Sequence, residues 1–379
     1  MERVTTISHA PGGWKVQDST WDNILQVSPK QLHSLHCPTV ARPAEQCFDV
    51  VQQAKSRSRG HVIFAQLRAI AKASEAHRAQ FIRKFELEPV LLTNLCLDSN
   101  GFAGCSPGFD EHGQLASYKI WSRFVVKQIL DKLRPKRSFI RRSVASNPPK
   151  TNAPIHTSRS ITNGWEWYEM DFHVHWTTSS FTVLCFNLPG HLQHAVEETF
   201  ISNAAGAEFS DPYRIFATII NTLLPVYDNS VWSIRNHICQ WEAARKEEPD
   251  YPLLHEIARY AIHVSETIAV AAKSLKDLQS QHQKFLMLRN RGQPSTEQAK
   301  SSDCPFNFPL MILEGQLSRS KSNECRVQNE TQLAFHMATQ RDSSTQLRIA
   351  EEAKKEASTM KAIAVITMTF LPATFVSVR

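Results

Sequence analysis

Asp171, His173 and His175 are the residues whose types and spacing most directly suggest chemistry. They alternate with apolar residues, so a β-strand would place all three side chains on one face. His191 and His194 follow at the three-residue spacing of one helical face. Carboxylate and imidazole groups bind transition metals, which makes Asp171, His173 and His175 candidate metal ligands. The alternative is a solvated strand face, because closeness in sequence alone does not create coordination geometry.

A second pattern, GCSPG at residues 104–108, matches the G-x-S-x-G sequence of serine hydrolases. That chemistry uses the backbone N–H after the serine as an oxyanion donor, and Pro107 has no N–H. We therefore expect a surface turn here. No phosphate-binding glycine loop or HExxH motif occurs in the sequence. These observations disfavour an enzyme, and no catalytic residue is predicted.

The segment 134–164 contains seven Lys or Arg residues, no acidic residue, and much Pro, Ser and Asn. This composition predicts a disordered linker. Its basic patch consists of Arg134, Lys136, Arg137, Arg141 and Arg142. The patch could contact anionic lipid head groups, direct nuclear import, or remain a solvated loop. A nucleic-acid partner is not favoured, because the patch has one aromatic residue, Phe139, for stacking on bases.

The overall composition is that of a folded protein of two or three domains: 379 residues, 42% hydrophobic and 21% charged. The net charge is +7. Eight scattered cysteines without a CxxC pair indicate reduced thiols in a cytosolic setting. The first residues lack the apolar core of a secretory signal.

Local patterns predict strands first and long helices afterwards. Val62–Phe64 reads as a strand and Ser74–Phe85 as a helix, whereas the apolar run after Pro89 fits either. Alternation in 164–190, followed by the apolar run Phe181–Phe186, predicts a β-hairpin.

Two long helices should follow this hairpin. Asp211 and Pro212 form a helix start, with Asp as the cap and Pro at the first position. Pro225 should kink this helix. A turn at 249–252 and a second helix over 253–288 make an antiparallel pair.

The C-terminal part predicts one very long helix, since no Pro or Gly interrupts 316–371. Small apolar residues at steps of three and four form a narrow stripe, typical of a helix that packs against like helices. This stalk stripe consists of Leu347, Ala350, Ala353, Ala357, Met360 and Ala364.

The last stretch, 362–378, carries no charge and is near the lower limit of about 17–25 residues for a membrane span. It predicts the start of an incomplete transmembrane segment, and the alternative is a buried helix end. The predicted membrane-entry residues are Ile363, Ile366, Phe370, Leu371, Pro372 and Phe375.

Several of these segments together resemble the CorA-like divalent-cation transporters, especially their divergent fungal branch. The resemblance is carried by MKAIAVITMTFLPATFVS (360–377), NGFAGC with LASYKIWSRFVVKQI (100–129), WYEMDFHVHW (167–176), DPYRIF (211–216) and DNSVWSIRNHICQWE (228–242). The family's Gly-Met-Asn signature and a second apolar span do not occur in the sequence.

The resemblance and the patterns together predict an α+β fold: an N-terminal α/β cytosolic domain, then long antiparallel helices and a very long C-terminal stalk helix. The expected divisions are 1–133 for the first part of the α/β domain, 134–163 for the linker, 164–204 for a hairpin and helix completing that domain, 205–288 for the helical hairpin, 289–308 for a loop, 309–371 for the stalk, and 362–378 for the membrane segment.

The resemblance implies the cytosolic domain and stalk of a Mg²⁺-type transporter. It also implies a homo-oligomer, pentameric as in the family, or association with complete CorA-like subunits. The C-terminus would meet a membrane, with the bulk of the chain cytoplasmic. Mg²⁺ or another divalent cation is the implied cofactor, and none follows firmly from the residues. Without the pore signature, the chain itself is expected not to conduct. The alternative is a soluble or membrane-associated interaction protein on a degenerate CorA-like scaffold.

Overall fold

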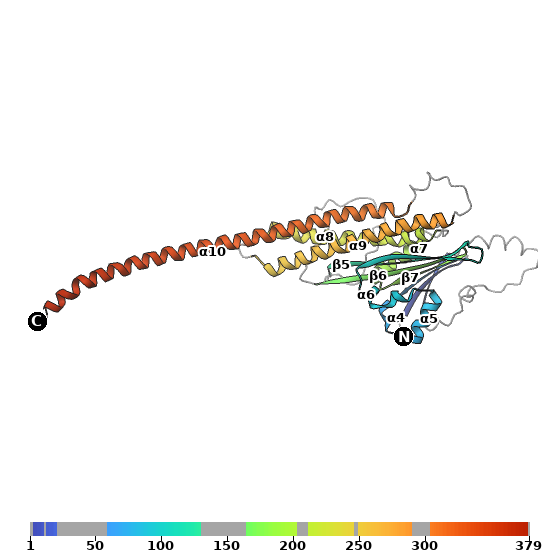
Figure 1. Cartoon of the computed structure of the whole chain (residues 1–379), viewed down its shortest axis with the longest axis horizontal. Coiled ribbons are helices and arrows are strands. Elements are labelled where there is room, and N and C mark those ends of the chain that lie inside the picture. Colours follow the sequence, from blue (N-terminus) through green and yellow to red (C-terminus); the bar gives the residue numbers. More distant parts are fainter. Residues whose placement is uncertain are drawn as a thin grey trace, which may run out of the picture.

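The computed structural model describes residues 3–10, 13–20, 59–129, 164–202, 211–245, 249–289 and 304–377. Helices cover both faces of one β-sheet, and a last helix projects far beyond the rest of the molecule (Figure 1). The α+β class predicted from the sequence, with antiparallel long helices and a very long C-terminal helix, is confirmed.

The sheet has seven strands in the order β2-β1-β3-β7-β6-β5-β4. The strands are β1 Arg3–Ala10, β2 Gly13–Thr20, β3 Arg59–Ala65, β4 Gly101–Phe109, β5 Leu115–Ile129, β6 Trp165–Thr177 and β7 Ser180–Phe186. Strands β4 to β7 follow one another as antiparallel neighbours, with Val174 opposite Val183. Strand β3 joins β7 in parallel, so the chain returns to the sheet at β4 only after a helical segment.

That segment covers one face of the sheet. It contains α4 Leu67–Lys72, α5 Glu75–Phe85, the 3₁₀ turn η2 Pro89–Leu92 and α6 Asn94–Leu97. Phe81 and Phe85 pack against Ile63, Leu184 and Phe186 of the sheet. The helix predicted after Ser74 is confirmed, and the hydroxyl oxygen of Ser74 caps it by accepting from the His77 N–H. The ambiguous run after Pro89 becomes two short helical turns.

The other face carries the larger core, under α7 Gly190–Ser202, α8 Pro212–Ala243 and α9 Tyr251–Arg289. Asp211 caps α8 as predicted, since its carboxylate accepts from the Tyr213 N–H at 2.8 Å. Phe172 of β6 meets Phe216 of α8 edge to face. Figure 1 shows the sheet between these long helices and the short helices α4 to α6.

The last helix, α10 Asn307–Ser377, has 71 residues and is therefore about 100 Å long. Its N-terminal part packs on α8 and α9, with Leu313, Val327 and Ala334 buried. Ion pairs fasten this part, one of them between Arg326 and Glu242 at 2.6 Å. Beyond it, α10 leaves the body (Figure 1).

The prediction of a surface turn at GCSPG is wrong, because residues 104–108 lie within strand β4. Ser106 pairs with Lys119 of β5, and Pro107 with Tyr118. A proline in a strand is compatible with an edge position, and β4 is the edge of the described sheet. Glycine and proline therefore mark an edge strand here.

Candidate functional site

The most unusual surface of the molecule is the free part of α10, residues 339–369, which we call the exposed arm. Every residue of the arm is exposed to solvent. The whole stalk stripe lies on it, with Leu347 68% and Met360 69% exposed. Ile363 and Ile366 also lie here, 55% and 56% exposed, whereas the side chains of Phe370, Leu371, Pro372 and Phe375 lie outside the described part.

An exposed run of this kind is chemically suited to association and not to catalysis. Contiguous apolar side chains on a surface mark sites where another protein or a membrane binds. Alanine on the stripe allows a neighbouring helix to approach closely. Within the described residues, none of the helices offers a stretch long and apolar enough to cross a membrane. The predicted segment 362–378 lies only partly within them.

The three candidate metal ligands of β6 are placed under the helices α4 to α6. Asp171 is held by Arg123, whose guanidinium donates to its carboxylate at 2.7 Å. Burial raises the pKa of Asp171 to about 6 although Arg123 opposes this. Burial lowers the pKa of His173 to about 3, so this side chain is neutral. In the described part of the chain, no group of three or more His, Cys, Asp or Glu residues is placed to hold a metal ion.

The alternative interpretation of these residues, a solvated strand face, is wrong for Asp171 and His173. Their exposed fractions are 7% and 1%. This part of the strand is buried because the short helices between β3 and β4 fold back over it. His191 and His194 are on α7, where His194 lies 3.6 Å from the Glu197 carboxylate. The basic patch Arg134, Lys136, Arg137, Arg141 and Arg142 lies outside the described residues.

Arg123 is a residue that the sequence analysis missed. It is buried, 2% exposed, and its guanidinium also donates to the carbonyl oxygens of Leu97 at 2.6 Å and Ser99 at 2.8 Å. A further contact reaches Glu169 at 3.1 Å. Arg123 thus joins α6 and its following turn to strands β5 and β6 of the sheet. The available signal was a basic residue, Arg123, between apolar stretches of β5, a strand that also carries Lys119 and Lys127.

Lys127, the third basic residue of β5, is surrounded by aromatic side chains. Its Nζ is 3.7 Å from the ring centre of Trp165 and 2.6 Å from Nδ1 of His263 on α9. Tyr260 and Trp167 complete the enclosure. Burial lowers the pKa of Lys127 to about 8, and the charge of Arg259 acts in the same direction. Lys127 therefore holds β5 against α9 at an electrostatic cost.

Comparisons with known proteins give distant likenesses. No protein-family model matches the sequence. A curated relative, the notoamide biosynthesis cluster protein M' of Aspergillus versicolor, is 26% identical over 237 residues. The match covers 56% of this chain and 50% of the relative, so the chain spans about half the length of that relative.

Among solved structures, the full-length CmaX protein has a TM-score of 0.48 at 12% identity, over 98% of this chain and 84% of CmaX. The cytoplasmic domain of ZntB from Vibrio parahaemolyticus scores 0.43 at 8% identity, over 74% of this chain and 88% of the domain. The complete CorA magnesium transporter of Methanocaldococcus jannaschii scores 0.42 at 7% identity, over 90% of this chain and 78% of the transporter. At these identities and scores the family is not established, and membership of the CorA-like family stays a prediction.

Proposed function

We propose that the chain is the cytosolic domain and stalk of a CorA-like, Mg²⁺-type transporter assembly, in which exposed arms associate side by side. The observation that carries this proposal is the exposed arm itself. It holds the whole stalk stripe on the part of α10 in which every residue is exposed, beyond the part that packs on α8 and α9.

Most of the stability of a helix in water comes from burying an apolar face. The N-terminal part of α10 has such a face, on α8 and α9, whereas the arm has none within the described part of the chain. Packing of arm on arm would bury Leu347 and Met360 and bring alanines together. The sequence resemblance to CorA-like stalks supports the same arrangement, with the membrane near the C-terminal end and a pentamer as the family's copy number.

The metal part of the proposal places Mg²⁺, or another divalent cation, between copies. The described residues of one chain offer no group of three or more ligands. Under this proposal, oxygen donors from two copies together supply the coordination shell. Under this proposal the divalent cation acts on the assembly and is also the cargo of the transporter.

A second candidate is an interaction protein on the same scaffold, whose arm binds another protein in place of further copies. The name of the Aspergillus relative favours it, since that name refers to a biosynthesis cluster and not to transport. Copy number in solution separates the two candidates.

The test is sedimentation velocity of the full chain in a mild detergent, comparing Ala357→Glu with Thr359→Glu. Both variants add one negative charge to the arm, but Ala357 lies on the stalk stripe and Thr359 on the opposite side of the helix. We expect the unsubstituted chain and Thr359→Glu to form oligomers and Ala357→Glu to shift toward monomer. A chain that is monomeric throughout contradicts the proposal and favours the interaction protein.

The same sedimentation experiment with Mg²⁺ or with a chelator tests the metal part. We expect Mg²⁺ to favour the larger species, because a cation shared between copies stabilises only the assembled state. If the chain forms oligomers and their size distribution is the same with Mg²⁺ and with chelator, the association of the arms stands and the shared cation is rejected.

A further inference from the structure

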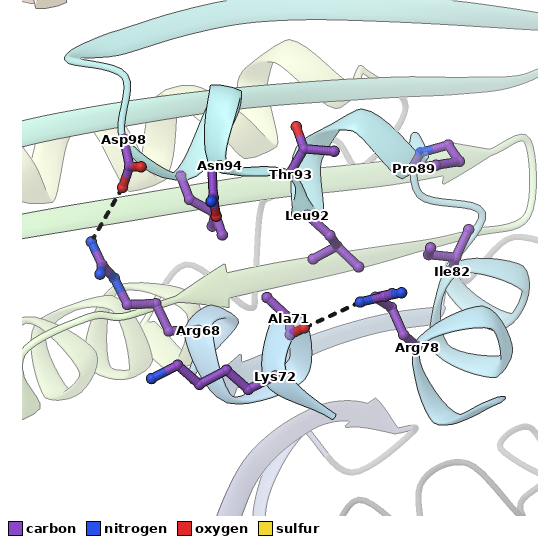
Figure 2. A pocket seen from close by; sticks show the side chains of 11 residues that line it. Arg68, Ala71, Lys72, Arg78, Ile82, Pro89, Leu92, Thr93, Asn94 and Asp98 are labelled. Atoms are coloured by element: carbon purple, nitrogen blue, oxygen red, sulfur yellow. Dashed lines mark hydrogen bonds and ion pairs between the residues drawn. The ribbon is translucent and has the colours of Figure 1, made fainter. Parts of the chain in front are cut away.

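A hollow of about 580 Å³ opens among the short helices, on the face of the sheet away from α8 and α9. Figure 2 shows its walls, which come from α4, α5, η2 and α6. The floor is apolar, formed by Ile82, Leu92 and Leu97. Leu92 and Leu97 are largely buried and belong to the core between the helices and the sheet, so the floor is part of the folded structure.

Three cations line this hollow: Arg68 and Lys72 from α4, and Arg78 from α5. Asp98 is the one acidic residue among the lining residues. Arg68 is already neutralised, because it contacts Glu169 at 2.9 Å and Asp98 at 3.9 Å. Its role is to connect the wall to strand β6.

Lys72 and Arg78 differ from Arg68 in their ion pairing. In the described part of the chain, no carboxylate forms an ion pair with either of them. Arg78 donates one hydrogen bond, to the carbonyl oxygen of Ala71 at 3.3 Å, which leaves most of its donors unused (Figure 2). Two uncompensated cations from neighbouring helices thus border one apolar floor.

We propose that this hollow binds a small amphiphilic monoanion, such as a carboxylate with an apolar body. Arg78 holds the anionic head through charge-assisted hydrogen bonds, and the exposed Lys72 side chain, which points away from Arg78 in Figure 2, turns toward the head on binding. The apolar body lies on Ile82, Leu92 and Leu97. Arg68 does not bind the head, because its charge is taken by Glu169 and Asp98.

Apart from the Lys72 side chain, the site is formed before a ligand arrives. The Arg123 guanidinium donates hydrogen bonds to the carbonyl oxygens of Leu97, the last residue of α6, and of Ser99 just after it. These bonds attach the end of α6 to the sheet. Arg78 fixes the end of α4 to α5 through Ala71. A preformed hollow requires little ordering on binding, which favours a small ligand. None of these contacts involves the exposed arm, so the inference is independent of the proposed function.

The test is calorimetric titration of octanoate into the full chain, compared with octylammonium and with inorganic phosphate. We expect octanoate to bind and the other two to bind at least tenfold more weakly. Octylammonium has the wrong charge, and phosphate has no apolar body. Equal binding of octylammonium, or of phosphate, would overturn the proposal.

Variants locate the binding. We expect about tenfold weaker octanoate binding for Lys72→Gln or Arg78→Gln, and about a hundredfold for the double variant, since each removes one charge-assisted contact. Arg83→Gln is the matched control, because Arg83 is exposed on α5 but does not line the hollow. Thermal unfolding followed by circular dichroism checks that each variant is folded. A folded double variant that binds octanoate like the unsubstituted chain, or a control that weakens binding equally, refutes the site.

Discussion

Replacing Arg123 by methionine should destabilise the sheet strongly, because Arg123 satisfies several buried groups at once. Methionine keeps the apolar stem but removes the cation from Asp171, which is 7% exposed. The carbonyl oxygens of Leu97 and Ser99 lose their donor as well. Breaking a buried ion pair by removing one partner costs about 3–5 kcal/mol. We therefore expect a loss of about 4 kcal/mol in the free energy of unfolding at pH 8.

The pH dependence of this loss identifies its cause. The pKa of Asp171 is already about 6 with Arg123 present, because burial raises it and Arg123 lowers it. Without Arg123 the pKa must rise further. At pH 5 the carboxyl of the variant takes up a proton and no longer buries a charge. The destabilisation should therefore be smaller at pH 5 than at pH 8.

The assay is urea unfolding followed by circular dichroism at both pH values, with Arg83→Met as the control on an exposed position. Asp171→Asn in the Arg123→Met background should recover part of the loss at pH 8, since it removes the uncompensated charge. A loss below about 1 kcal/mol, or an equal loss at pH 5 and pH 8, would show that the buried pair is not what holds this face together.

Two further substitutions test buried cations elsewhere in the core. The pKa of Lys127 falls from 10.5 to about 8, mainly by burial and also through Arg259, while Glu256 opposes. Folding therefore disfavours its charged form: the cost is complete below pH 8 and disappears as the pH rises to 10.5. That cost is about 3 kcal/mol, of which the contact with Trp165 offsets about 1 kcal/mol. Lys127→Met should thus be more stable by about 2 kcal/mol at pH 7 and equal near pH 10.5 in urea unfolding; a less stable variant at pH 7 would contradict this. For His282, in contrast, folding favours the charged form. Burial lowers its pKa, but the hydrogen bonds and charges of Asp211 and Cys304 outweigh burial and raise it to about 9. Its contribution is complete below pH 6.5 and is lost as the pH rises through 9, so His282→Gln should cost about 2–3 kcal/mol at pH 6 and little at pH 10. Thermal unfolding across this range measures it, and a loss that does not change with pH would exclude the charged pair.

The features predicted well from the sequence depend on local patterns. Helical spacing and the cap at Asp211 with Pro212 identified α8, and the uninterrupted run 316–371 identified α10. The stalk stripe could be named because small residues recur on one face of a helix, and its role in association stays a prediction. Each of these signals is contained within a few turns of chain.

The features that were missed depend on contacts distant in sequence. Asp171 and His173 looked solvated because the helices that cover them come from a segment about a hundred residues earlier. The pairing of β3 with β7 also depends on contacts distant in sequence. For example, the Leu67 N–H donates a hydrogen bond to the side chain of Asn187, 120 residues later. The hollow near Lys72 and Arg78 forms only when four short elements fold together, and a periodic pattern in the sequence does not predict such a site.

The edge strand β4 has a consequence for the behaviour of the protein in a crowded solution. An unpaired strand edge is a template on which a strand of another molecule can add, and such addition leads to fibres. Gly104, Pro107 and Gly108 lie on this edge. Pro107 offers no N–H to an incoming strand, and glycine has low strand propensity. The segment that imitates a hydrolase motif is thereby a poor template for a strand of another molecule at this edge of the described sheet.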